Sequence, residues 1–183
     1  MSRQEVAGKR KVRVAVDGMG GDHAPSEVVK GAARAIREMD VEVIITGLRP
    51  DLTEELRSHG LHDSTIRMVE AVEVVRDGEN AIIAAMRKPN SSVAVATKLV
   101  KDGQADAVVS AGSTGAFMVN AYRHLGCLPG VDRPIIGGPF LKLAPDTFLL
   151  DMGANVGCQA SDLLKFAVAG SVFVKKFHGI EEP

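Results

Sequence analysis

Short apolar segments rich in β-branched residues alternate with longer amphipathic segments along most of the chain. An apolar run of this kind, bounded by glycine or polar residues, predicts a strand. Because strands that alternate with connecting helices are typical of a mainly parallel sheet, we expect an α/β fold. The predicted strands cover residues 12–16, 41–46, 65–69, 107–110 and 147–150.

The amphipathic segments predict helices between and after these strands. In the first of them, Val28, Val29, Ala32, Ala33 and Ile36 are spaced along one helical face. Glycine and proline in residues 126–140 predict a long irregular excursion before the last strand. The predicted helices cover residues 26–39, 51–58, 79–86, 92–101, 116–125 and 160–176.

Composition and charge narrow the possible classes of protein. With 45% hydrophobic and 25% charged residues, the 183-residue chain resembles an ordinary globular protein, and since no linker divides it we expect one domain. A formal net charge of -1 argues against a nucleic-acid binder. Lys9, Arg10 and Lys11 precede the first strand, so we expect residues 1–11 to form a flexible, solvated basic arm and residues 12–183 to form the folded part.

The cysteines and the apolar runs favour a cytoplasmic protein. Cys127 and Cys158 lie outside any metal-binding or disulfide spacing, so we expect reduced thiols and no metal site. Residues 1–11 lack the apolar core of an export signal, and no later apolar run approaches the length of a membrane span.

Candidate chemistry lies in three turns, with the sequences "VDGMGGD", "VVSAGSTG" and "LLDMGAN". Each turn is predicted to follow a buried strand and to precede a helix. Ligands of open α/β sheets bind outside the carboxyl ends of the strands, so the three turns can converge on one crevice. Glycine-rich turns before helix N-termini favour an anion such as phosphate.

The second turn is the best candidate for a phosphate site. Ser113 and Thr114 can donate hydroxyl hydrogen bonds, and the amides from Gly112 to Gly115 add backbone donors. Alternatively, Ser113 and Thr114 only cap the following helix. The turn matches neither the Walker motif nor the dinucleotide-binding fingerprint, so nucleotide binding has no specific support.

The other two turns hold polar side chains with two possible roles each. Asp22 beside His23 can form a proton carrier, or Asp22 caps the helix and His23 is an ordinary polar residue. Asn155, four residues after Asp151, can stabilise an oxyanion or bind phosphate, or it only forms a turn.

Several segments resemble one family. "VAVDGMGGDHAP" is similar to the opening segment, VDAMGGDxxP, of the bacterial fatty acyl-acyl carrier protein:phosphate acyltransferases, the PlsX family. The resemblance continues through "LVKDGQADAVVSAGSTGAFM", "LPGVDRP" and "LLDMGANVGCQASDLLKFAVAGSVF" and covers about residues 11–180.

This resemblance implies a fold and a reaction. The fold is a three-layer α/β/α sandwich similar to those of isocitrate and isopropylmalate dehydrogenases and phosphotransacetylases, usually in a homodimer. The reaction transfers an acyl chain from acyl carrier protein to inorganic phosphate, for phospholipid synthesis, and requires no cofactor. Peripheral membrane association is a further family property.

The reaction also suggests roles for the residues of the three turns. Phosphate is the nucleophile, so an anion cradle and an oxyanion stabiliser are needed. Asp22, His23 and Asn155 are the catalytic candidates, and Asp17, Ser110 and Asp151 are expected to support the turns. The candidate phosphate-binding residues are Gly20, Gly21, Gly112, Ser113, Thr114 and Gly115, with help from Asn155.

The chain departs from the family pattern in three respects. Ser113 stands where the family usually has asparagine, and Gly157 stands where it commonly has aspartate. Family members are also longer, so we expect this chain to correspond to their N-terminal portion. The alternatives are therefore a phosphotransacetylase-like acyltransferase that uses coenzyme A, or a truncated module that binds phosphate or a partner without turnover.

Overall fold

The computed structural model describes residues 10–62, 64–138 and 147–183. Contacts within the chain divide it into two compact units, Met1–Gly126 and Cys127–Pro183. Along the chain, the first unit ends at Gly126, which follows a helix. The expectation of one domain, based on the absence of a linker, stays a prediction.

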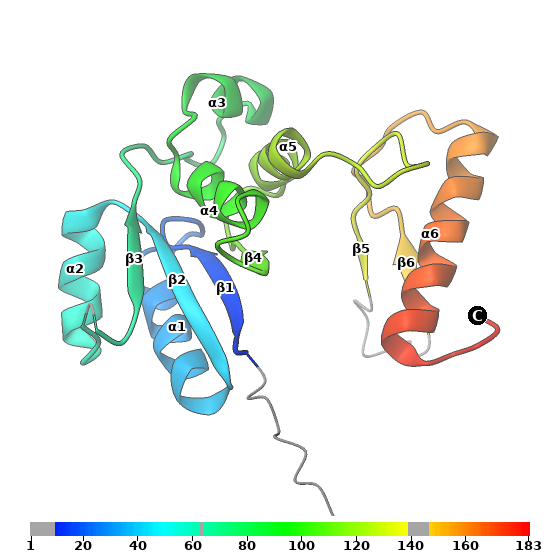
Figure 1. The fold of residues 1–183 in the computed structure, drawn as a ribbon. Helices are drawn as coiled ribbons and strands as arrows, with labels where there is room; N and C mark the ends of the chain where they lie inside the picture. The colour runs from blue at the N-terminus through cyan, green and yellow to red at the C-terminus, as the bar shows by residue number, and fades with distance from the viewer. Residues whose placement is uncertain (1–9, 63, 139–146) are drawn as a thin grey trace, which may run out of the picture. The chain divides into compact units, whose positions relative to one another are not determined.

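The first unit contains a parallel sheet with the strand order β3-β2-β1-β4 (Figure 1). β1 pairs with β2 along its whole length, and three residues of β1 pair with β4. Paired parallel strands end at the same edge of a sheet, so the turn after β1 and the turn after β4 lie side by side. The strands are β1 (Val12–Asp17), β2 (Val41–Gly47), β3 (Arg67–Glu70) and β4 (Ala107–Val109).

The helices of the first unit follow the predicted order with shifted bounds. α5 was expected from residue 116, but it begins at Thr114, so that Thr114 and Gly115 belong to its first turn. Gly60 and Gly103 have φ of 70° and 65°, as expected of glycines that follow helices. The helices are α1 (Ser26–Glu38), α2 (Arg49–Ser58), α3 (Ala81–Arg87), α4 (Ser92–Lys101) and α5 (Thr114–Leu125).

The core of the first unit lies on both faces of the sheet. Successive side chains of a strand point to opposite faces. Along β2, Val43 and Ile45 join a cluster with α1 and α2, whereas Ile44 joins a cluster with Ala96 and Leu99 of α4. Helices therefore cover both faces, and the predicted three-layer arrangement is confirmed for this unit.

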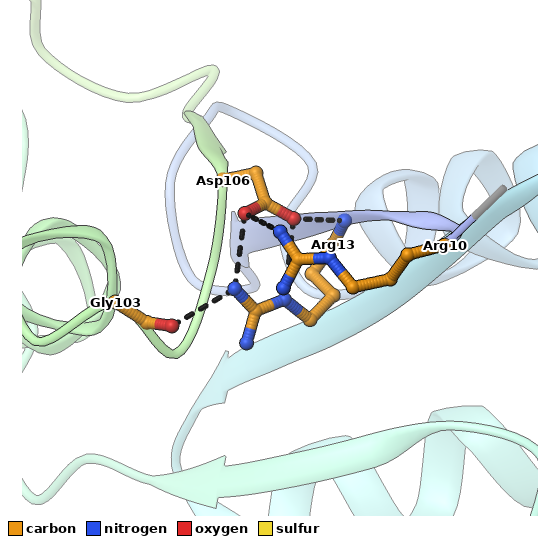
Figure 2. Close-up of polar contacts among 4 residues, drawn as sticks. All are labelled: Arg10, Arg13, Gly103 and Asp106. Carbon is orange, nitrogen blue, oxygen red and sulfur yellow. Dashed lines mark hydrogen bonds and ion pairs between the residues drawn. The ribbon is translucent and has the colours of Figure 1, made fainter.

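An ionic cluster fixes the beginning of β1 against the loop before β4 (Figure 2). Arg13 donates through its guanidinium and its backbone N–H to the carboxylate of Asp106, at 2.9 Å in each case, and through its guanidinium to the carbonyl of Gly103 at 2.8 Å. Arg10 donates to the same carboxylate at 2.7 Å. The side-chain and backbone hydrogen bonds from Arg13 hold the pKa of Asp106 well below its ordinary range.

Part of the predicted basic arm lies within the described residues. Arg10 pairs with Asp106, and Lys11 pairs with Asp40 at 3.1 Å. These two side chains are thus engaged in ion pairs at the start of the sheet. Residues 1–9, including Lys9, lie outside the described residues.

The second unit contains a short antiparallel pair, β5 (Gly137–Gly138) and β6 (Leu149–Leu150), and the helix α6 (Ala160–His178). The predicted irregular segment therefore includes a strand, while residues 139–146 lie outside the described residues. The prediction that the third turn follows a buried strand of the parallel sheet is wrong, since β6 pairs with β5 and Leu149 is 40% exposed.

Within the described ranges, no helix has both the length and the apolar content needed to cross a bilayer.

Candidate functional site

The turns after β1 and β4 are joined by a buried aspartate. Asp17, the last residue of β1, is 3% exposed. Its Oδ2 accepts a hydrogen bond from Ser110 Oγ at 2.7 Å, and its Oδ1 accepts one from the Met19 amide at 3.3 Å. Ser110 Oγ in turn accepts a hydrogen bond from the Gly112 amide at 3.1 Å. Asp17 and Ser110 therefore fix the two turns against each other, 93 residues apart in the chain.

This junction depends on the absence of a side chain at Gly20. A Cβ on Gly20 would lie 2.5 Å from Asp17 Oδ2, 2.8 Å from Ser110 Oγ and 2.9 Å from the Gly112 nitrogen. Gly21 has a φ of 115°, which disfavours other residues. Gly20 is thus explained by the close approach of the two turns, and Gly21 by its backbone conformation.

The phosphate candidates of the second turn lie at the start of α5. Ser113 is the N-cap, and its Oγ accepts a hydrogen bond from the Ala116 amide at 3.4 Å. The capping alternative is therefore confirmed for Ser113, whereas Thr114 is the first helical residue. The amides of Thr114 and Gly115 have no acceptor within the helix, and the positive end of its dipole lies there.

Asp22 and His23 are exposed and line a cavity of about 670 Å³ beside these turns. Within the described part of the chain, no hydrogen bond joins the two side chains. α1 begins without a side-chain cap, so the alternative role of Asp22 as a helix cap is not observed. The two residues are neighbours of the joined turns but do not form a preassembled pair.

No motif of the three turns indicates this cavity. Its walls are mainly apolar and come from β1, β2, β4 and α1. Gly31, Ala32 and Ala35 are the small residues that α1 contributes to these walls. Their spacing was the available signal, because small residues on a helix leave space against its neighbours.

The third turn is held by its own polar network in the second unit. Asp151 Oδ1 accepts from the Ile136 amide at 2.9 Å, and Oδ2 accepts from the backbone and side-chain amides of Asn155 at 2.7 Å and 3.1 Å. Burial alone raises the pKa of Asp151, but the hydrogen bonds from Ile136 and Asn155 outweigh it and leave the pKa below its ordinary value.

Asn155 already uses its side-chain donors in this network. Its Nδ2 donates to the Pro134 carbonyl at 2.9 Å as well as to Asp151. An oxyanion would need one of these amide hydrogens, so in this arrangement Asn155 shapes the loop. The convergence of this turn with the first two stays a prediction.

Potential metal ligands are not clustered in the described residues. No group of three or more His, Cys, Asp and Glu residues lies close enough together in this part of the chain to hold an ion. Cys127 and Cys158 are free thiols.

Comparison with known proteins decides the family. A family model described as fatty acid synthesis protein matches residues 12–183. The chain belongs to this family. The phosphate acyltransferase of Desulfitobacterium hafniense is 46% identical over 172 residues, which cover 94% of this chain and 51% of that protein. The phosphate acyltransferase of Cyanothece sp. is 44% identical over 178 residues, which cover 96% and 52%.

These relatives confirm the resemblance inferred from the turn motifs. The chain spans about half the length of the relatives it matches. The activity, substrates and partners of the longer proteins therefore enter as proposals for this chain.

Two solved structures share its fold. A phosphotransacetylase from Streptococcus pyogenes superposes with a TM-score of 0.66 at 20% identity, covering 93% of this chain and 55% of that chain. The EutD phosphotransacetylase from Staphylococcus aureus superposes with a TM-score of 0.64 at 22% identity, covering 92% and 54%. The likeness confirms the predicted α/β fold of the phosphotransacetylase kind.

Proposed function

We propose that the chain acts as a phosphate acyltransferase. It makes acyl phosphate from acylated acyl carrier protein and inorganic phosphate, for phospholipid synthesis. The supporting observation is its 46% identity to a protein of that name over a region that includes the joined turns of β1 and β4. The proposal includes a cytoplasmic location, a homodimer and peripheral contact with membranes.

The reaction balances without a cofactor. An oxygen of hydrogen phosphate attacks the thioester carbonyl carbon, a C–O bond forms and a C–S bond breaks. The proton of the phosphate ends on the sulfur of the released carrier thiol. The protein must therefore hold the anion, stabilise the tetrahedral oxyanion and pass one proton.

The joined turns supply the anion cradle in this proposal. Gly20 and Gly21 allow close backbone approach, and the amides of Thr114 and Gly115 supply donors at the positive end of α5. Ser110 and Asp17 hold the cradle in shape, and Ser113 fixes the start of the helix.

The remaining candidates act on the proton and the oxyanion. His23, assisted by Asp22, carries the proton to the leaving sulfur from its exposed place beside the turns. Asn155 serves in oxyanion stabilisation only after exchanging one of its present hydrogen bonds, whereas Asp151 supports its loop.

The second candidate is acyl transfer with coenzyme A, favoured by the shared phosphotransacetylase fold. The cavity of about 670 Å³ beside the turns favours a long acyl chain over an acetyl group. Its walls are mainly apolar, and its volume is in the range of pockets that enclose organic ligands of that size.

The test is release of free thiol from long-chain acyl carrier protein by the folded chain, with and without phosphate. The same assay with long-chain acyl-coenzyme A and with acetyl-coenzyme A separates the two candidates. We expect phosphate-dependent release from the carrier protein. A folded chain that leaves this thioester intact, while the Desulfitobacterium hafniense relative cleaves it in parallel, would contradict the proposal for this chain.

A further inference from the structure

Two helices of the first unit begin at one small cavity. The cavity has a volume of about 10 Å³, which is about the space of one oxygen atom or water molecule. α4, with 10 residues, contributes Ser92 and Val93, and α5, with 12 residues, contributes its start. The polar and glycine residues that line the cavity are Asp17, Gly20, Ser92, Ser110, Gly112 and Ser113.

Ser92 is a buried donor without a present use. Its residue is 2% exposed, its amide donates to the Glu73 carbonyl at 3.1 Å, and its carbonyl accepts from Thr46 Oγ1 at 2.8 Å. Within the described part of the chain, its hydroxyl makes no hydrogen bond, and unlike Ser91 Oγ this oxygen is not completely enclosed. Because buried hydroxyl groups are ordinarily paired, an unpaired one that lines a cavity points to a ligand.

The start of α4 adds backbone donors to the same place. The N-cap residue Ser91 makes no side-chain cap hydrogen bond, so the amides of Val93 and Ala94 have no acceptor within the helix. Together with the start of α5, two positive helix ends border the cavity. This arrangement favours an oxygen atom that carries negative charge.

The carboxylate of Asp17 lines the cavity as well, and it opposes a fully ionised anion. Its oxygens already accept from Ser110 and Met19, but a carboxylate oxygen can accept two hydrogen bonds. At neutral pH, inorganic phosphate retains a proton that it can donate to a carboxylate, and sulfate retains none. A site that combines donors with one carboxylate therefore distinguishes these two anions.

We propose that this cavity takes one oxygen of inorganic phosphate, with the Ser92 hydroxyl as its donor and Asp17 as the acceptor of the phosphate proton. The inference rests on the proposed function for the identity of the anion. It adds the Ser92 hydroxyl and the amides of Val93 and Ala94 to the cradle and makes Asp17 the residue that selects phosphate over sulfate.

Ser91 provides a matched control for Ser92. It is also a buried serine whose hydroxyl is unpaired among the described residues, but it does not line the cavity. The experiment titrates the full chain with inorganic phosphate or sulfate by calorimetry. We expect Ser92→Ala to weaken phosphate binding about tenfold or more, as for loss of a hydrogen bond to a charged group, and Ser91→Ala to leave it unchanged. Equal affinities for the two variants would overturn the proposal.

Anion selectivity is the second measurement. The unaltered chain should bind phosphate at least about tenfold more tightly than sulfate, and Asp17→Asn should reduce this preference because an amide can donate to sulfate. If Asp17→Asn does not fold, the ratio of phosphate affinity to sulfate affinity in the unaltered chain is still a test. Equal affinities for the two anions would refute selection by Asp17. If the chain binds phosphate selectively but leaves acyl thioesters intact, the proposed function is wrong and the phosphate site is still supported.

Discussion

Asp17 and Asp151 both stand where a strand gives way to a glycine-containing turn, yet they serve their turns differently. Asp17 accepts from a hydroxyl of another turn, 93 residues away, and so joins two segments. Asp151 accepts from Ile136 and Asn155 and closes a network within one unit. The first arrangement leaves helix amides available to a ligand, whereas the second uses its donors for the loop itself.

The largest expected effect comes from separating the two joined turns. In Gly20→Ala, the new Cβ would meet Asp17 Oδ2 at 2.5 Å, so the turns must move apart. We expect a loss of about 100-fold in phosphate-dependent acyl transfer and of about 1–3 kcal/mol in the free energy of unfolding. Thiol release and denaturant titration measure the two quantities.

Gly31→Ala is the control for the stability measurement only, because Gly31 lines the cavity proposed for the acyl chain. A Cβ on Gly31 meets no atom within 4 Å, and the residue lies inside α1. We expect the free energy of unfolding to rise by about 0.5–1 kcal/mol, because alanine favours the helix. If Gly20→Ala retained full activity, the junction of the turns would not be part of the site.

Two substitutions with smaller expected effects should each destabilise only one of the two units. Ser110→Ala leaves a buried Asp17 oxygen without its donor and should cost about 1–3 kcal/mol, with faster amide exchange in the first unit. Asn155→Ala removes the hydrogen bonds to Pro134 and Asp151, but Asp151 keeps two backbone donors. It should cost about 1 kcal/mol, with faster exchange in the second unit. Exchange that rises equally in both units would contradict the separation of the two networks.

The smallest effect concerns pH. The folded pKa of Asp151 lies below its ordinary value, so its contribution to stability is present above the unfolded pKa of about 3.9 and is lost as pH falls through the folded pKa. The stability difference between the unaltered chain and Asp151→Asn should therefore be constant between about pH 5 and pH 7 and shrink below about pH 4. A carbon NMR titration of the carboxyl group measures the pKa directly, and an unshifted value would contradict the network.

Hydrophobic periodicity predicted the first unit well because its elements bury continuous apolar faces. The centre of β2, Val43–Ile45, is covered on both sides, so these residues form an unbroken apolar run. In the second unit the same signal predicted the helix at α6, but it does not define the strands, since β5 is two glycines and β6 two leucines, too short for any periodicity. Their pairing depends on contacts between segments that the local pattern does not encode.

The candidate site was predicted in its parts but not in its connections. Motifs located Asp17, Ser110 and the glycines, because turns with special backbone requirements have restricted compositions. The hydrogen bond between Asp17 and Ser110 and the unpaired hydroxyl of Ser92 arise from how separate elements pack. The turn motif also predicted Thr114 outside the helix, whereas the cap at Ser113 starts α5 at Thr114.

The Arg13–Asp106 cluster has a consequence for how this protein can change over evolution or in the laboratory. Asp106 adjoins the start of β4, and Ser110 follows its end, so the β1–β4 ladder is anchored by polar contacts at both ends. Between these anchors, Ala107 is exposed, whereas Ala15 is fully buried and Val14, Val16 and Val109 line the larger cavity. Ala107 is therefore the position of the ladder at which a change in side-chain size should disturb the turns least.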